Sequence, residues 1–422
     1  MMRSLWRNRE FNLLWTSQAL SDLGDGVASL ALALLVLVET GDPVSAGVVG
    51  TASHVARLAF RLPAGVLADR FDRRRVMILC DLLRLVAFGA LAVAVFTGSA
   101  GLALILVVAV LDAAGSALFS TAEDASLRSI VPVEQLPAAV ARNEARSYGV
   151  SLAGPPLGGV LFSIGHAVPF IGNVISYLIS IVAVLFIRRP LQSDRDEEPQ
   201  TYGAALTEGV RFVLANPFLR ALLLVAAPLN FAIGGVLFTL IVALQQNGTQ
   251  PGVIGLTETI VAAGGLLGAA FAPALQSRLS LPTLTRVICW AAAGLLATAS
   301  LLTSSIAAAV PLGLAVFLGP ACNAALFGFQ AAVTPDRLQG RVISVVMFVA
   351  TSMAALAPIL GGLLLATWSA STAVLFFAAF VGLSALTATF SSGIRHAALP
   401  GAGTDPPPAD ELPAHAVADR AS

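Results

Sequence analysis

Residues 65–75 read GVLADRFDRRR and place six charged side chains between two long apolar runs. The flanking runs cover residues 44–66 and 76–96, and each is long enough for a helix that crosses a hydrocarbon core of about 30 Å. Four of the charged residues are arginines, and basic residues in short loops stay on the cytoplasmic side of a membrane. These residues therefore predict a transmembrane helical hairpin whose turn lies in the cytoplasm.

Apolar runs separated by polar breaks extend in both directions from this hairpin. The composition agrees, with 57% hydrophobic residues, 11% charged residues and a mean hydropathy of +0.86, whereas soluble chains carry about 25% charged residues. The sequence predicts an all-α membrane protein with twelve transmembrane helices in two six-helix bundles. The runs lie near residues 12–38, 44–66, 76–96, 101–119, 144–164, 168–187, 218–244, 252–275, 283–303, 305–328, 342–366 and 368–390.

The arginines are distributed unevenly between the predicted loops. With the N-terminus inside, the loops at residues 39–43, 97–100, 165–167 and 245–251 face outward, and none of them contains an arginine. The arginine-rich stretch 65–75 then faces inward. This distribution predicts a multi-pass protein of the cytoplasmic (inner) membrane with both termini in the cytoplasm.

The longest interior break, residues 188–217, contains a charged run at 193–198 and an amphipathic stretch at 202–215. It divides the chain near its middle, as a linker between two bundles would. We expect an N-terminal six-helix bundle, a cytoplasmic linker, a C-terminal six-helix bundle and a disordered cytoplasmic tail. The expected bounds are 1–187, 188–217, 218–394 and 395–422.

The two halves are related in sequence by a constant offset. Pro132 and Pro335 are 203 positions apart, and so are Pro155 and Pro358. One offset that aligns two separate motifs indicates a duplication, which is the parallel-repeat arrangement of many transporters.

Several classes of protein are disfavoured by what the chain contains. All 24 basic residues are arginine, so no phosphate-loop lysine or Schiff-base lysine exists, and we expect no nucleotide as a partner. The formal net charge is zero, which argues against nucleic acid. The three cysteines and four histidines have no metal-ligand spacing, and neither HExxH nor GxSxG occurs. We expect no cofactor, no metal and no enzymatic activity.

The stretch 65–75 is similar to the signature that the major facilitator superfamily carries between its second and third helices. It departs at Asp72, where the general pattern has glycine. Segments 8–31, 208–224 and 333–344 resemble the drug-exporter branch that includes macrolide and enterobactin exporters. The resemblance, which extends over nearly the whole chain up to Arg395, implies the two-bundle fold and secondary transport.

The resemblance also implies a conformational latch at the membrane face. In the family, the acid at the position of Asp69 meets nearby arginines and the N-terminal end of helix 11, while glycine at Gly65 allows close approach of backbone. The alternative is that the arginines only fix the topology. The latch residues would be Gly65, Asp69, Arg70, Arg73 and Arg74.

The fifth predicted helix carries a run that resembles the motif the family associates with antiporters: Gly154, Pro155, Gly158 and Gly159. The usual first glycine is replaced by Val150. Proline kinks a membrane helix, and glycine lets a neighbour pack closely. A close-packed helix pair without a transport role is the alternative interpretation.

Ionisable residues inside predicted spans are costly unless they face a cavity or one another. Asp22 and Asp25 are three positions apart and share a helix face. The candidates for proton coupling are Asp25, Asp22, Asp112, Arg57 and Glu258. A static ion pair of Arg57 with Asp25 or Asp112 is the alternative. The arginine that some drug exporters carry in helix 4 has no counterpart in residues 101–119.

Polar and aromatic residues within the spans are candidates for substrate contact, although interhelical hydrogen bonds and core packing explain them as well. We expect proton-coupled export of small, largely apolar compounds by alternating access, with the substrate, protons and the lipid bilayer as partners. The alternatives are a nutrient importer and, less favoured, a membrane enzyme or receptor. The contact candidates are Asn173, Tyr177, Asn230, Phe231, Asn323 and Phe327.

Overall fold

The computed structural model describes residues 5, 8–189, 191, 202–395 and 397. Every regular element in these residues is helical, which confirms the predicted all-α class. The long helices of the first half are α1 (Arg9–Thr40), α2 (Pro43–Arg70), α3 (Arg73–Phe96), α4 (Leu102–Ile130), α5 (Leu136–Ile164) and α6 (Val168–Phe186).

The second half repeats this pattern after the amphipathic helix α7 (Tyr202–Ala215). Its fifth rod is broken at a short turn before Pro358, which has no N–H to donate to the preceding turn. The rods are α8 (Pro217–Gln246), α9 (Pro251–Gln276), α10 (Leu281–Ala299), α11 (Ala309–Val333), α12 (Gln339–Ser352) with η5 (Ala354–Leu356) and α13 (Ala357–Thr367), and α14 (Ala370–Phe390). The short elements are η2 (Val133–Gln135), η3 (Ile306–Ala308), η4 (Asp336–Leu338) and α15 (Ser392–Arg395).

Most of the predicted spans agree with the rods, but α4 and α5 are longer than expected. The predicted fourth span ends at residue 119 and the predicted fifth span begins at residue 144, where hydropathy falls. The helices continue through Glu123 and Arg142 because these charged side chains find partners inside the protein.

Ten of the described helical segments are long and apolar enough to cross a membrane by length and composition alone. The remaining two rods, α2 and α5, are of comparable length, at 28 and 29 residues. They are not apolar enough by the same measure: α2 carries Arg57 and Arg61, and α5 combines Arg142 and Arg146 near its start with the glycines and prolines of residues 154–159. Both helices lie where the two halves meet.

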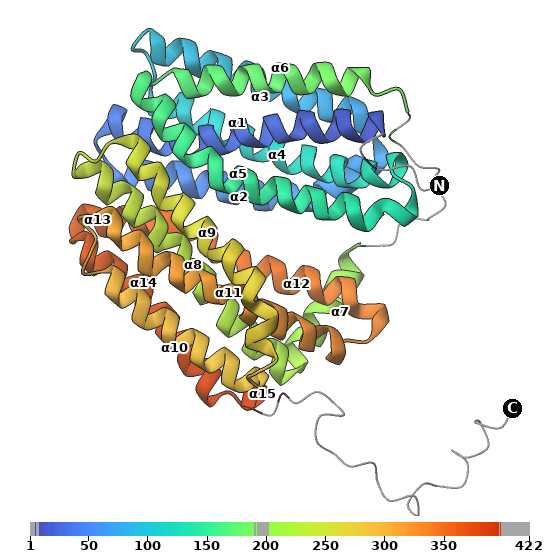
Figure 1. Ribbon diagram of the computed structural model, residues 1–422, viewed down its shortest axis with the longest axis vertical. Coiled ribbons are helices and arrows are strands. Elements are labelled where there is room, and N and C mark those ends of the chain that lie inside the picture. The colour runs from blue at the N-terminus through green and yellow to red at the C-terminus, as the bar shows by residue number, and fades with distance from the viewer. Residues whose placement is uncertain (1–4, 6–7, 190, 192–201, 396, 398–422) are drawn as a thin grey trace, which may run out of the picture.

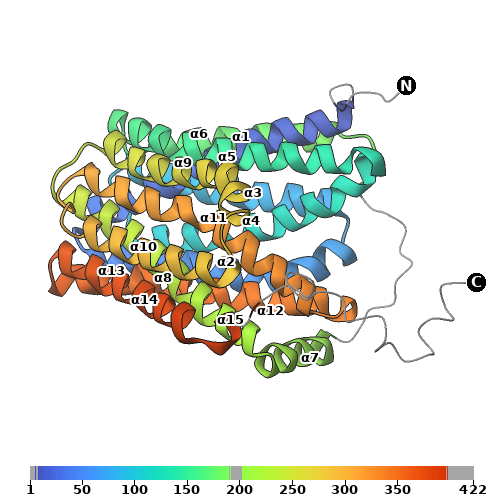
Figure 2. The same ribbon diagram turned by 60° about the horizontal axis from the view of Figure 1, so that its bottom comes forward.

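The halves form two bundles that come together at one end (Figure 1). Helices α5 and α9 run side by side across the boundary, as both views show, and α2 packs against α13 in the same way. Helix α7 lies at the opposite end, beside the start of α12 (Figure 2). We call these two ends the far end and the α7 end.

Each bundle has its own apolar core. Phe88 of α3 packs against Phe170 and Tyr177 of α6, with ring centroids about 6 Å apart. In the second half, Phe231 of α8 packs against Phe377 of α14, and its ring is fully buried. These aromatic contacts fix the rotation of the outer helices relative to the inner ones.

Candidate functional site

A cluster of charged residues lies inside the first bundle around Arg84 of α3, whose side chain is only 2% exposed. The Arg84 guanidinium forms an ion pair with Asp25 of α1. Its Nε donates a hydrogen bond of 2.9 Å to Asp112 of α4, and Nη1 lies 3.6 Å from Asp81, one turn back on α3. One buried cation is therefore shared by three carboxyl groups from three helices, which we call the Arg84 cluster.

Tyr177 of α6 completes the Arg84 cluster. Its hydroxyl donates to Asp25 Oδ1 at 2.6 Å and lies 3.1 Å from Asp112 Oδ1. The Arg84 guanidinium carbon sits 4.3 Å from the centre of the Tyr177 ring, which is a cation–π distance. Asn173, one turn earlier on α6, donates to the Tyr177 oxygen at 3.1 Å. Asn173 and Tyr177 were predicted as candidates for substrate contact, but in this structure both are buried and hydrogen-bonded within the Arg84 cluster.

A second group of charges surrounds Arg146 of α5. Its Nη1 and Nη2 donate to the two carboxylate oxygens of Glu123 at 2.9 and 3.3 Å, a bidentate pair. Its Nε lies 3.0 Å from Asp22 Oδ2. Because Asp22 and Asp25 are neighbours on one face of α1, the two groups of charges meet along that helix.

A polar hollow of about 220 Å³ lies between the Arg84 cluster and the group of charges around Arg146. Four acids line it, namely Asp22, Asp25, Glu123 and Asp124, against the two cations Arg84 and Arg146. The hollow is therefore acidic, and an added proton or an added cation would reduce its excess negative charge.

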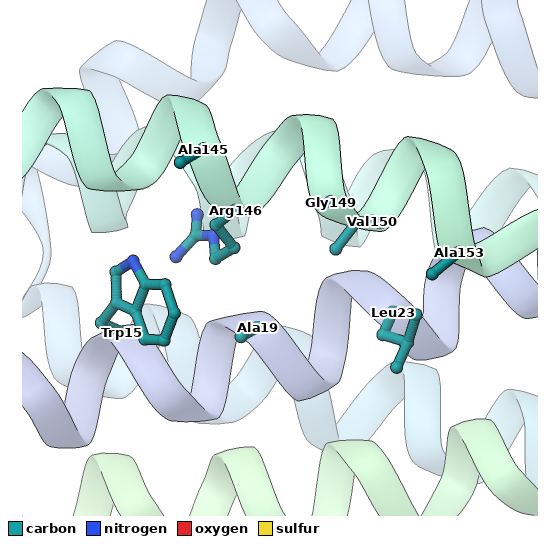
Figure 3. A pocket seen from close by; sticks show the side chains of 8 residues that line it. All are labelled: Trp15, Ala19, Leu23, Ala145, Arg146, Gly149, Val150 and Ala153. Atoms are coloured by element: carbon teal, nitrogen blue, oxygen red, sulfur yellow. The ribbon is translucent and has the colours of Figure 1, made fainter. Parts of the chain in front are cut away.

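An apolar groove of about 410 Å³ lies between α1 and α5 and shares Arg146 with the hollow. Figure 3 shows Trp15 and Arg146 at one end of the groove and Leu23 and Ala153 at the other. The Trp15 indole donates to the backbone oxygen of Arg142, which fixes its ring against the groove. The remaining lining residues are Ala19, Ala145, Gly149 and Val150.

Two other predicted coupling residues lie apart from these clusters. The alternative interpretation, an ion pair of Arg57 with Asp25 or Asp112, is not what the structure shows, because Arg84 pairs with both acids and Arg57 is exposed on α2. Glu258 is half-buried on α9 and has no ion-pair partner among the described residues.

The remaining contact candidates are scattered over the second half. Phe231 is buried against Phe377, and Asn230 donates to the backbone oxygen of Ala350 at 3.3 Å. Asn323 is exposed on α11, and Phe327 is half-buried. These residues do not form one group with Asn173 and Tyr177 in this structure.

The decisive residues that sequence reasoning missed are Asp81, Arg84, Glu123 and Arg146. Asp81 and Arg84 lie three positions apart within the predicted span 76–96. Two charged residues in an apolar run are the sequence feature that could have identified them as members of a buried charged site. Glu123 lies just beyond the predicted fourth span, 101–119, whereas Arg146 lies inside the predicted fifth span, 144–164, near its start. Residues 101–119 contain no arginine, but α4 continues to Ile130 and includes Arg128, and Arg84 of α3 supplies a cation that contacts Asp112 of α4.

The proposed latch residues are only partly in contact. Arg73 is buried, and its Nη1 donates to the backbone oxygens of Ala125 and Leu191 at 2.9 and 3.0 Å. Arg70 is exposed and Arg74 half-buried, while the Asp69 side chain lies outside what the structure describes.

Gly65 does not make the close approach that was expected of it. A Cβ at this position would have no described atom within 4 Å. The neighbourhood of Gly65 at the α7 end is therefore open in this structure.

The antiporter-like motif on α5 has two faces. Gly154 and Gly158 face α1, where a Cβ would crowd the backbone of Gly26 and Val27. Gly159 faces α9, where a Cβ would overlap the backbone oxygen of Pro251. The same sequence run thus packs within its own bundle and across the boundary.

The contact between α5 and α9 is reciprocal. A Cβ on Gly159 would strike the Pro251 oxygen, and a Cβ on Gly255 would strike the Pro155 oxygen. Across this contact, Thr259 Oγ1 donates to the backbone oxygen of Leu152 at 2.9 Å.

Helices α2 and α13 repeat this arrangement. Cβ atoms on Gly362 and Gly47 would strike the backbone oxygens of Pro43 and Pro358, respectively. Thr51 Oγ1 accepts a hydrogen bond of 3.0 Å from the Ile359 amide. Besides the offset of 203 on α5 and α13, an offset of 208 relates Pro43, Gly47 and Thr51 to Pro251, Gly255 and Thr259.

These contacts close the far end of the protein, and the same helices are exposed toward the α7 end. Phe60 of α2 is 39% exposed, Tyr148 of α5 39% and Phe348 of α12 42%. The two halves are joined at the far end, and Figure 1 shows them apart toward the α7 end.

Comparisons with known proteins agree with this architecture. The chain is 26% identical over 263 residues to macrolide efflux protein A of Streptococcus pyogenes, which covers 61% of this chain and 65% of the relative. It is 27% identical over 367 residues to the multidrug efflux pump Tap of Mycolicibacterium fortuitum, covering 80% of this chain and 85% of that pump.

Solved structures show the same fold. A bacterial homologue of the human lysosomal transporter Spinster, in an inward-facing and unoccupied conformation, aligns with a TM-score of 0.72 at 16% identity. The alignment covers 94% of this chain and 100% of that one. The sequence profile of the Major Facilitator Superfamily matches residues 14–358. The chain therefore belongs to the major facilitator superfamily.

Proposed function

We propose that this transporter exports small, largely apolar compounds from the bacterial cytoplasm in exchange for protons. The observation that carries the proposal is the apolar groove that shares Arg146 with an acidic hollow. The groove offers contact to an apolar solute, while the hollow holds carboxylates that can bind protons. The names of the efflux relatives support export.

Alternating access follows from the contacts between the halves. The far end is closed by backbone contacts at Gly159 and Gly362, and no covalent change is needed to separate them. We place the α7 end in the cytoplasm, together with both termini, because the arginine-rich loops lie there. In this state the site opens inward, and closing that side would release the far-end contacts.

In this proposal, proton flow is coupled to solute export because protons and the guanidinium groups of Arg84 and Arg146 compete for the same carboxylates. When a carboxylate near Arg84 or Arg146 gains a proton, its attraction for the guanidinium falls and the ion pairs rearrange. One proton that moves inward across 100 mV supplies about 2.3 kcal/mol, which corresponds to about a fiftyfold concentration ratio. Asp25 is the first candidate for the carboxylate that binds this proton, and Asp22 is the second.

Import of a nutrient such as a sugar or organic anion is the alternative. It is disfavoured by the groove, whose lining offers few hydrogen-bonding side chains besides Trp15 and Arg146. An organic anion would also meet the acidic hollow beside it.

The test uses purified protein in liposomes with erythromycin, a macrolide, as the probe. An imposed pH gradient should drive erythromycin against its concentration gradient, in the direction opposite to proton flow. Failure to concentrate erythromycin and a panel of apolar dyes, with uptake of a sugar instead, would reject export.

A variant with a filled groove tests where the solute binds. Ala153→Phe places a ring in the groove and should raise the erythromycin concentration at half-maximal transport. Ala270→Phe, at an exposed position on α9, is the matched control and should leave it unchanged.

A further inference from the structure

Asp81 differs from the other two carboxyl groups of the Arg84 cluster in its surroundings. Its side chain is fully buried, whereas those of Asp25 and Asp112 are 24% and 16% exposed. The 3.6 Å between its Oδ1 and the Arg84 Nη1 is too long for a hydrogen bond. Within the described part of the chain, neither Asp81 oxygen has a hydrogen-bond partner.

The elements packed around Asp81 bring other polar groups near it. Ser180 of α6 lies beside Asp81, and its hydroxyl also lacks a hydrogen-bond partner of good geometry among the described residues. Tyr177 lies three positions earlier on the same face of α6. The titratable and charged groups around Asp81 are Arg84 and Cys80 on α3, Asp112 on α4, Tyr177 on α6, and Asp22 and Asp25 on α1.

The charges of the Arg84 cluster do not balance if every acid is ionised. One guanidinium faces three carboxylates, which leaves two negative charges uncompensated in an apolar bundle. A buried carboxylate without a hydrogen-bond donor is costly, and a bound proton removes that cost. Asp25 and Asp112 accept hydrogen bonds from Arg84 or Tyr177, whereas Asp81 has only the Ser180 hydroxyl beside it and no charged donor within hydrogen-bond distance among the described residues.

We propose that Asp81 is the proton-storage group of this transporter. It holds a proton while Arg84 is paired with Asp25 and Asp112, and it becomes the counter-ion of Arg84 when that proton moves to Asp25. This inference rests on the proposed proton coupling. It identifies a buried acid that holds the proton until Asp25, which lines the hollow, can take it up.

The exchange balances without any further reactant. The O–H bond of the Asp81 carboxyl group breaks and an O–H bond forms on Asp25, while the Arg84 guanidinium changes its partner from Asp25 to Asp81. The charge of the cluster stays constant, and nothing is oxidised or reduced. In this proposal the proton passes by way of the Ser180 hydroxyl, which lies beside Asp81, and the Tyr177 hydroxyl, which donates to Asp25. Asp25, which lines the hollow, then releases the proton to water.

Infrared spectroscopy of the full chain in lipid membranes tests the storage group without any substrate. The wild type at neutral pH should give the carbonyl stretching band of a protonated carboxyl group. Asp81→Asn should remove that band, and Glu134→Gln, at an exposed acid, should leave it. Persistence of the full band in Asp81→Asn, or its absence from the wild type, would overturn the proposal.

Abundance provides a second measurement. Asparagine replaces a protonated aspartic acid without changing its charge, so Asp81→Asn should reach the membrane within about twofold of the wild-type amount. A large loss of abundance would indicate that Asp81 is ionised and needed as a charged partner of Arg84, which contradicts storage.

Transport distinguishes this inference from the proposed function. Asp81→Asn should exchange erythromycin for erythromycin across liposomes but fail to concentrate it under a pH gradient. Wild-type accumulation by Asp81→Asn would reject the storage role and leave proton-coupled export intact. If the wild type itself fails to accumulate erythromycin, the proposed function falls, and the infrared band still decides whether Asp81 holds a proton.

Discussion

Gly159 of α5 lies directly against the backbone oxygen of Pro251 of α9, so that no side chain fits between the two halves at this point. Gly362 and Pro43 make the equivalent contact between α13 and α2. Because glycine lets two backbones meet, the far end is closed by surfaces that match without side chains between them. Closure of this kind is easily lost when a side chain is added.

Gly159→Leu should therefore favour the conformation in which the far end is open. Overpacking of this kind costs about 1–3 kcal/mol, which corresponds to a shift of about 5-fold to 150-fold in the equilibrium between the two conformations. Erythromycin transport should fall, while labelling of a far-end cysteine placed at Thr51 should rise. Gly172→Leu, where the structure leaves open space, is the control, and equal loss of transport in both variants would argue against this role.

Asp25→Asn should uncouple transport without unfolding the protein. Arg84 keeps Asp112 and Asp81 nearby, so the variant should reach normal abundance and exchange substrate, yet not accumulate it under a pH gradient. The competing account makes Asp25 only a counter-ion of Arg84. Recovery of gradient-driven accumulation in Asp25→Asn with Arg84→Gln would support that account and exclude Asp25 as the proton carrier.

Arg146→Gln should lower the amount of folded protein. It leaves the buried carboxylate of Glu123 without its bidentate partner, and breaking a buried pair in this way costs about 3–5 kcal/mol. The double variant Glu123→Gln with Arg146→Gln should restore abundance, because no charge is left unpaired. Thermal unfolding in detergent measures the effect, and a double variant as unstable as Arg146→Gln would show that packing, not charge, sets the loss.

Cysteine labelling checks the orientation in the membrane. Val133, which is 76% exposed between α4 and α5, should react as cysteine only with reagents that reach the cytoplasm. Asn247, exposed between α8 and α9, should react from outside. The three native cysteines are buried and give low background. Labelling of Asn247→Cys solely from the cytoplasmic side would reverse the topology.

The latch can be tested through Asp69 despite the undescribed position of its side chain. We expect Asp69→Asn to stay folded in the membrane while transport falls more than abundance, because a charge that favours closure of the α7 end is lost. Asp336→Asn, an exposed acid in η4, is the matched control. Normal transport by Asp69→Asn would leave the arginines of 65–75 with a topological role alone.

Hydropathy and charge along the chain were sufficient to predict the rods and their number. A membrane span is a local property of about 20 residues, so the sequence determines it without knowledge of its neighbours. The constant offset between Pro155 and Pro358 predicted the repeat. In the structure the two helices that carry these prolines, α5 and α13, each pack a glycine against a backbone oxygen of the other half. The limits of α4 and α5 were misjudged because their charged ends are stabilised by partners far away in sequence.

Only the tertiary structure decided which charges meet. Asp25, Arg84 and Asp112 come from three helices, and their contact depends on how each helix is rotated about its axis and packed against the others. Arg57 and Arg84 both lie in long helices that pack against α4, yet only Arg84 is turned toward Asp112. The spacing of residues within one helix carries no information about that rotation relative to its neighbours, since the rotation is set by close packing of many side chains at once.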